Sequence, residues 1–117
     1  MKDLLIDVLE SICPNVYLQG SLNPDEQYPD DFITFFVENT RDLSHYDNEV
    51  NSIDWEVTII YYSTNPVKVN TVPAQIRTAL KNAKFIISGR GADMPCDRES
   101  HTGWIMNFTY TEKIINN

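Results

Sequence analysis

The chain has 117 residues, of which 42% are hydrophobic and 11% aromatic; this composition is typical of one globular domain spanning 1–117 and argues against disorder. Its formal net charge of −8 argues against general affinity for nucleic acid, which needs clustered lysine and arginine to neutralise phosphates. The charge is uneven, because residues 1–60 hold thirteen acids and two bases, whereas residues 61–117 hold four acids and seven bases.

The expected compartment is the cytosol, and no membrane segment is predicted. No stretch approaches the roughly 20 consecutive apolar residues that cross a bilayer. The first residues, Met1 to Asp7, carry acids where a signal peptide needs a continuous apolar segment. Cys13 and Cys96 are far apart and lack a Cys-x-x-Cys neighbour, so we expect two free thiols.

The first predicted element is a helix that ends at about Cys13, because Pro14 disfavours helical geometry in the residue before it. Its apolar residues recur with the period of a helix. They are Leu4, Leu5, Val8, Leu9 and Ile12. Beside them lies an acidic stripe of Asp3, Asp7 and Glu10.

Three strands are predicted next. Val16–Leu18 is short, and residues 20–31 are rich in turn formers and acids, which favours a loop. Residues 32–38 are almost continuously hydrophobic, as expected of a central strand covered on both faces. Residues 39–52 are polar and predict a second loop. Residues 53–63 alternate apolar and polar side chains, as in a strand with one buried face.

A second helix is predicted from Asn65, which can cap it, to about Ala83. Pro66 suits its first turn, whereas Pro73 is expected to bend or divide it. A basic stripe follows the helical spacing, formed by Arg77, Lys81 and Lys84. Residues 85–88 predict a strand, residues 89–100 an irregular loop, and residues 104–111 a final alternating strand.

The predicted order is therefore α-β-β-β-α-β-β. With one helix first and one between groups of strands, we expect an α+β fold whose two helices pack on one face of a mainly antiparallel sheet.

Several residues are of types that bind metals or act as nucleophiles. One group has metal-ligand types: Asp93, Cys96, Asp97 and His101, with His45, Asp47 and Glu49 from an earlier segment. It lacks the paired Cys or His spacing of zinc sites and the regular acidic spacing of calcium loops, so a polar loop is favoured. Neither cysteine has an activating motif, and Gly89-Arg90-Gly91 favours a turn over a phosphate loop. The sequence predicts no enzyme, no cofactor and no metal.

A resemblance rests on the order and spacing of several short motifs. These are Tyr28-Pro29-Asp30-Asp31-Phe32, Tyr46-Asp47-Asn48-Glu49, Trp55 before Tyr61-Tyr62-Ser63-Thr64-Asn65-Pro66, and His101-Thr102-Gly103. Together they resemble the tail-terminator, or tail-completion, proteins of tailed phages and prophages and their head–tail joining relatives, over about residues 4–110. Two features depart from the pattern, namely Pro73 inside a helix and Lys84 where a glycine would more naturally end it.

The resemblance implies an α+β structural subunit in the phage head–tail junction. Such subunits form a ring, usually a hexamer, that caps the tail tube and offers the docking surface for the filled head. The implied partners are copies of the chain, the tail-tube protein and head-connector proteins, and DNA passes through without specific binding. The implied location is the host cytoplasm during assembly and the virion head–tail junction afterwards.

Two sets of site residues follow as hypotheses. The acidic stripe of Asp3, Asp7 and Glu10 faces the basic stripe of Arg77, Lys81 and Lys84 on the next subunit, or pairs with it within one chain. A second set lies on long loops, where some members line the ring lumen and repel DNA. Its members are Asp25, Glu26, Asp30, Asp31, Asp42, Asp47 and Glu49.

Two alternatives remain at the sequence level. An acidic protein-binding or inhibitory module, such as a nucleic-acid mimic, would be a stable monomer or dimer with a salt-dependent basic partner. A head-closure or adaptor protein would also be a small ring subunit without catalytic motifs.

Overall fold

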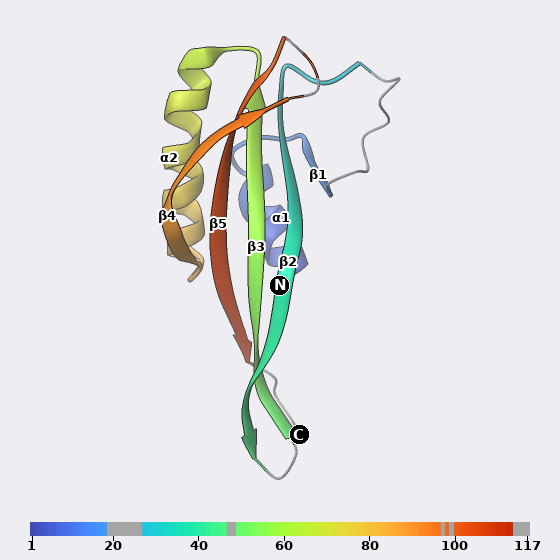
Figure 1. The fold of residues 1–117 in the computed structure, drawn as a ribbon, viewed down its shortest axis with the longest axis vertical. Helices are drawn as coiled ribbons and strands as arrows, with labels where there is room; N and C mark the ends of the chain where they lie inside the picture. Colours follow the sequence, from blue (N-terminus) through green and yellow to red (C-terminus); the bar gives the residue numbers. More distant parts are fainter. Residues whose placement is uncertain (19–26, 47–48, 97, 99, 114–117) are drawn as a thin grey trace.

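The computed structural model describes residues 1–18, 27–46, 49–96, 98 and 100–113, and of residues 43–46 and 49–51 it describes the backbone alone. The elements follow the predicted order, and they form a five-stranded sheet with two helices (Figure 1). They are α1 (Lys2–Glu10), β1 (Val16–Leu18), β2 (Asp31–Tyr46), β3 (Glu49–Ser63), α2 (Pro66–Asn82), β4 (Ile86–Pro95) and β5 (Thr102–Lys113). The α+β prediction is confirmed.

The strands lie in the order β1-β2-β3-β5-β4, and every pair is antiparallel except β1 with β2. β1 accompanies β2 only from Ile33 to Phe35, and β5 accompanies β3 only as far as Ser52. The strand predicted to be central, β2, lies second in the sheet, and β3 is the middle strand.

The main core lies between the sheet and the two helices, which cover the same face as predicted (Figure 1). α1 contributes Leu5 and Leu9, and α2 contributes Ile76 and Leu80, all with no exposed surface. The strands supply alternate residues, among them Ile33, Phe35, Val57, Ile59, Tyr61, Met106 and Phe108. Burial of each such side chain stabilises the fold by about 1.5–3 kcal/mol. None of the described helices is long and apolar enough to cross a membrane.

A smaller cluster covers part of the opposite face of the sheet. Phe32, Ile60 and Tyr62 are buried there, and the rings of Phe32 and Tyr62 stack with their centroids 4.9 Å apart. Tyr28 packs edge-on against Phe32. Because consecutive strand residues point to opposite faces, burial of both faces explains the continuous hydrophobicity of the start of β2.

The hairpin of β2 and β3 is longer than predicted. The sequence predicts a loop over residues 39–52, but residues 39–46 and 49–52 continue both strands, and the register extends to Tyr46 opposite Glu49. We call residues 38–54 of this hairpin the arm. Its tip extends beyond the rest of the sheet at the lower end of Figure 1, and the molecule measures 53 × 29 × 22 Å.

Both helices end close to their predicted positions. α1 ends at Glu10 rather than Cys13, although the Cys13 N–H still donates to the Leu9 carbonyl at 2.9 Å. The Asn65 side chain caps α2 by accepting a hydrogen bond from the Val67 N–H at 3.0 Å, as predicted. α2 is one continuous helix through Pro73, so the alternative of two divided helices is wrong.

β4 runs to Pro95, so most of the predicted loop 89–100 is strand. The register with β5 shifts between Ser88 and Ala92, where Gly89 and Gly91 have φ values of 75° and 97°. These left-handed values suit glycine, and the extra residues form a bulge that interrupts the alternation on which the prediction depended.

Candidate functional site: a polar junction and a groove along α2

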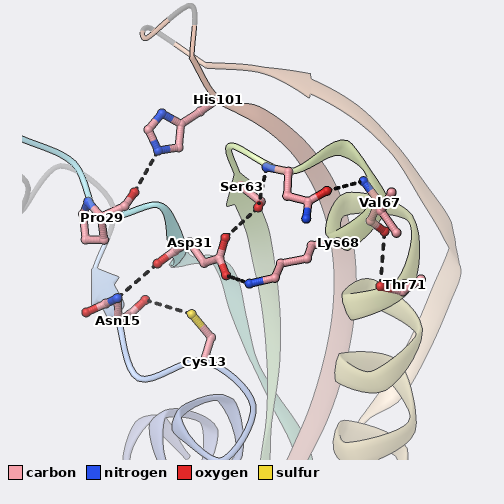
Figure 2. A network of polar contacts seen from close by, with 10 residues as sticks. Cys13, Asn15, Pro29, Asp31, Ser63, Val67, Lys68, Thr71 and His101 are labelled. Carbon is pink, nitrogen blue, oxygen red and sulfur yellow. Dashed lines mark hydrogen bonds and ion pairs between the residues drawn. The ribbon is translucent and has the colours of Figure 1, made fainter.

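A network of polar side chains joins the start of β2, the end of β3 and the start of α2 (Figure 2). The Asp31 carboxylate accepts hydrogen bonds from the Ser63 hydroxyl at 2.6 Å and from the Lys68 ammonium at 2.7 Å. Ser63 has no exposed surface, and its oxygen also accepts the Asn65 N–H at 3.0 Å. The network therefore fixes the turn from β3 into α2.

The segment after α1 is attached to the same junction. The Asn15 side chain donates to the Asp31 carbonyl at 3.1 Å, and the Ile33 N–H donates to the Asn15 carbonyl at 2.8 Å. The Cys13 thiol lies 3.9 Å from that carbonyl. These contacts hold the end of α1 against the first residues of β2.

His101 closes the junction from the start of β5. It is 7% exposed, and its Nε2 lies 2.8 Å from the Pro29 carbonyl oxygen. Since a carbonyl only accepts, Nε2 carries the proton, and in the neutral ring Nδ1 accepts the Ser100 hydroxyl at 2.9 Å. The ring also packs edge-on against Phe32. Both nitrogens of His101 are thus engaged in structural contacts.

The pKa values of four groups in and beside the junction are shifted from their usual values. Burial opposes ionisation of Asp31, but hydrogen bonds from Lys68 and Ser63 outweigh it, so the pKa of the Asp31 carboxyl lies below its usual value. The hydrogen bond to Asp31 raises the pKa of the Lys68 ammonium. Burial raises the pKa of the Cys13 thiol and raises the pKa of Tyr61 to about 12. Asp31 and Lys68 form an ion pair, while Cys13 and Tyr61 are neutral.

The described side chains of this junction make structural contacts. A buried thiol with a raised pKa supplies little thiolate for nucleophilic attack. Within the described residues, no three or more His, Cys, Asp and Glu side chains are placed to hold a metal ion. The candidate metal group also included four residues that are not fully described. Asp47 and Asp97 lie outside the described residues, and of His45 and Glu49 only the backbone is described.

Three of the motifs that carry the phage resemblance meet at this junction. They are the segments 28–32, 61–66 and 101–103. Of the fourth motif, 46–49, only Tyr46 and Glu49 are described, and they pair at the end of the arm, far from the junction. Comparison with known protein families and with curated proteins found no match. The geometry of the junction and of the surfaces around it therefore carries the functional argument.

The predicted interface residues lie in four different settings. Asp3, Asp7 and Glu10 are exposed on α1. The structure describes every residue of the acidic and basic stripes, and no ion pair links the two. Lys81 is exposed on α2. Lys84 has φ of 75° and lies beyond the last helical residue, so it does not extend a stripe along α2. Arg77 is half-buried, and its Nε is buried without a partner.

The acidic set assigned to long loops is also divided. Asp25, Glu26 and Asp47 lie outside the described residues, and the Glu49 side chain is not described. The remaining three are Asp30, which is exposed before β2, Asp31, which starts β2, and Asp42, which is exposed on the arm. The loop assignment is therefore wrong for Asp31, Asp42 and Glu49, because strands begin earlier and end later than the apolar pattern indicates.

The sequence analysis did not predict a groove that lies between α2 and the strands β4 and β5. One part of it, with a cavity volume of about 500 Å³, is lined by residues that include Asn70, Pro73, Arg77, Arg90 and Trp104. The adjoining part, of about 440 Å³, shares Val69 and Asn70 and continues towards His101. The available signal was Gly89-Arg90-Gly91, since an arginine between two glycines next to a strand is typical of a bulge that redirects a side chain.

Proposed function

We propose that the chain is a structural subunit of a phage or prophage head–tail junction, and specifically a tail terminator. Copies of the chain form a ring, expected to be a hexamer, that caps the tail tube and offers a docking surface to the head. The junction around Asp31 holds each subunit rigid, and the surfaces beyond it make the contacts.

The observation that carries the proposal is the arm. Past Leu43 and Ser52 no third strand of the described residues joins the hairpin, and two-stranded ribbons are marginally stable alone. No described arm residue belongs to either hydrophobic cluster. β1 pairs with β2 only up to Phe35, so among the described strands none covers the outer edge of β2 along the arm. An unpaired edge of this kind favours contact with another chain.

Deletion of the gene in the phage or lysogen, followed by electron microscopy, tests the role. Overlong tails support termination of the tail tube. Tails of normal length that remain unattached to filled heads place the chain among the joining or adaptor proteins instead. Particles with normal tails joined to heads contradict any role at the head–tail junction. In that case, a purified chain that is monomeric and binds a basic protein in a salt-dependent way favours the acidic binding module.

Among the described members of the acidic set, we assign the position in the ring lumen to Asp30. Asp30 is exposed, whereas the charge of Asp31 is paired with Lys68. An Asp30→Lys ring should assemble normally but slow the passage of DNA, because a cation in the lumen attracts phosphates. Unchanged DNA ejection from particles that carry the substitution contradicts a lumenal position.

A further inference from the structure

The groove beside α2 is basic at one end. Arg77 projects from the helix side and Arg90 from the strand side, and no carboxylate lines this part of the groove among the described residues. The Nε of Arg77 is a buried donor without a partner. An unpaired buried donor costs free energy that a bound acceptor recovers. This end of the groove is therefore suited to carboxylates.

The strand wall of the groove is held rigidly. The Trp104 indole N–H donates to the Arg90 carbonyl at 2.9 Å, across the bulge of β4. A Cβ atom on Gly91 would collide with that indole nitrogen and with the Ile105 carbonyl oxygen, so the bulge needs glycine there. Arg90, which follows one left-handed glycine and precedes another, is fixed at the rim of the groove.

The helix wall is apolar beside Arg77. Val69 and Pro73 are buried on it. The groove thus sets guanidinium donors beside an apolar wall, and a segment with exposed carboxylates complements the donors.

The arm is such a segment. Residues 38–54 contain five acids and a single base, Arg41, and Arg41 already pairs with Asp54 at 3.3 Å. Glu38 and Asp42 are exposed, and Glu38 accepts a hydrogen bond from Thr58. The arm extends beyond the end of α2 (Figure 1), whereas the groove is lined by α2 residues from Val69 to Arg77 and by Arg90, Gly91 and Trp104. A groove that receives it belongs to another copy.

We propose that the basic end of the groove between α2 and β4 binds the acidic arm of a second copy of this chain. The inference rests on the proposed ring and names the contact that closes it. Arm and groove are different surfaces, so the contact is heterologous and repeats from subunit to subunit until the ring closes. Carboxylates of the arm meet Arg77 and Arg90, and this pairing sets the register between neighbours.

The test uses two complementary full-length variants and measures mass in solution at low salt. Arg90→Glu disables the groove but keeps the arm, and Asp42→Lys disables the arm but keeps the groove. Each alone should associate at least roughly tenfold more weakly than the wild type. In their equimolar mixture the intact groove of the Asp42→Lys variant still receives the intact arm of the Arg90→Glu variant, so the mixture should associate more strongly than either variant alone. Both substitutions are at exposed side chains, and thermal melting checks that both variants remain folded.

Matched controls separate this contact from one between the two helices. Lys81→Glu on α2 and Glu10→Lys on α1 change exposed charges outside the groove and the arm, and they should assemble like the wild type. The inference is overturned if these two abolish assembly while Arg90→Glu and Asp42→Lys do not, or if the mixture stays monomeric. A wild-type chain that is monomeric at its highest soluble concentration overturns it as well. Rings that form regardless of Arg90 leave the proposed function standing, which the gene deletion judges separately.

Discussion

Asp31 shows how one residue ties three elements together. Its lowered pKa means that the folded state favours the carboxylate, so its contribution is present at pH values above the unfolded pKa near 3.8 and is lost as pH falls through the lower folded value. Asp31→Asn should cost about 1 kcal/mol at neutral pH, since Lys68 is half exposed and solvent weakens the pair. Urea unfolding at neutral pH and below pH ~4 measures this, and the two proteins should converge in the acid range.

The neighbouring carboxylate is the matched control for that experiment. Asp30 is exposed, and its backbone carbonyl, which accepts the Thr64 N–H at 3.0 Å, survives substitution. Asp30→Asn should change stability little at either pH. An equal loss for Asp31→Asn at both pH values would show that side-chain packing, and not the ionised carboxylate, accounts for its effect.

The two cysteines should differ in reactivity. Cys13 is 4% exposed and its thiol pKa is raised by burial, so both access and thiolate fraction are low. In a Cys96→Ser variant, a disulfide reagent at mildly alkaline pH should leave the native protein unmodified and react fully after denaturation. Rapid reaction of the native variant would mean that the end of α1 opens easily from the core.

At the scale of elements, α2 ends in a motif that usually calls for glycine. The Phe85 N–H donates to the Leu80 carbonyl at 2.9 Å and the Lys84 N–H to the Lys81 carbonyl at 3.1 Å, with Lys84 left-handed between them. Lys84→Gly should therefore stabilise the protein by roughly 0.5–1 kcal/mol, because it removes the cost of a left-handed side chain. Lys81→Gly, inside the helix, should instead lose about 1 kcal/mol. Chemical denaturation measures both, and no gain for Lys84→Gly contradicts the strain.

The bulge of β4 gives a second matched pair. Gly89 and Gly91 both have positive φ, but a Cβ on Gly89 meets nothing within 4 Å, whereas one on Gly91 meets Ile105 and Trp104. Gly89→Ala should cost about 1 kcal/mol from backbone strain alone. Gly91→Ala should cost at least ~1 kcal/mol more, because neighbours must move. Equal losses in denaturant unfolding would show that the bulge relaxes without cost.

The elements predicted correctly are those whose side chains face a core. The period of α1 and α2 and the alternation of 53–63 and 104–111 record burial on one side, and Asn65 with Pro66 marks a helix start directly. Residues 39–46 and 49–52 of the arm lack this pattern, because none of their described side chains joins either hydrophobic cluster. The Asp31 junction was equally invisible, since its partners are 32 and 37 positions away in the chain.

At the scale of the whole molecule, we expect the arm to contribute little to the stability of the rest of the fold. Leu43 lies directly opposite Ser52, so replacing residues 44–51 by Asn-Gly closes the hairpin with a tight two-residue turn. The thermal midpoint should change little, because within the described residues β2 and β3 pair only with each other past Ser52. Self-association should be lost or greatly weakened, and sedimentation beside calorimetry measures both properties. A shortened chain that melts far below the wild type would place the arm within the folding unit. One that assembles normally would show that residues 44–51 are dispensable for the ring, because contacts between subunits would then come from the rest of the chain, Asp42 included.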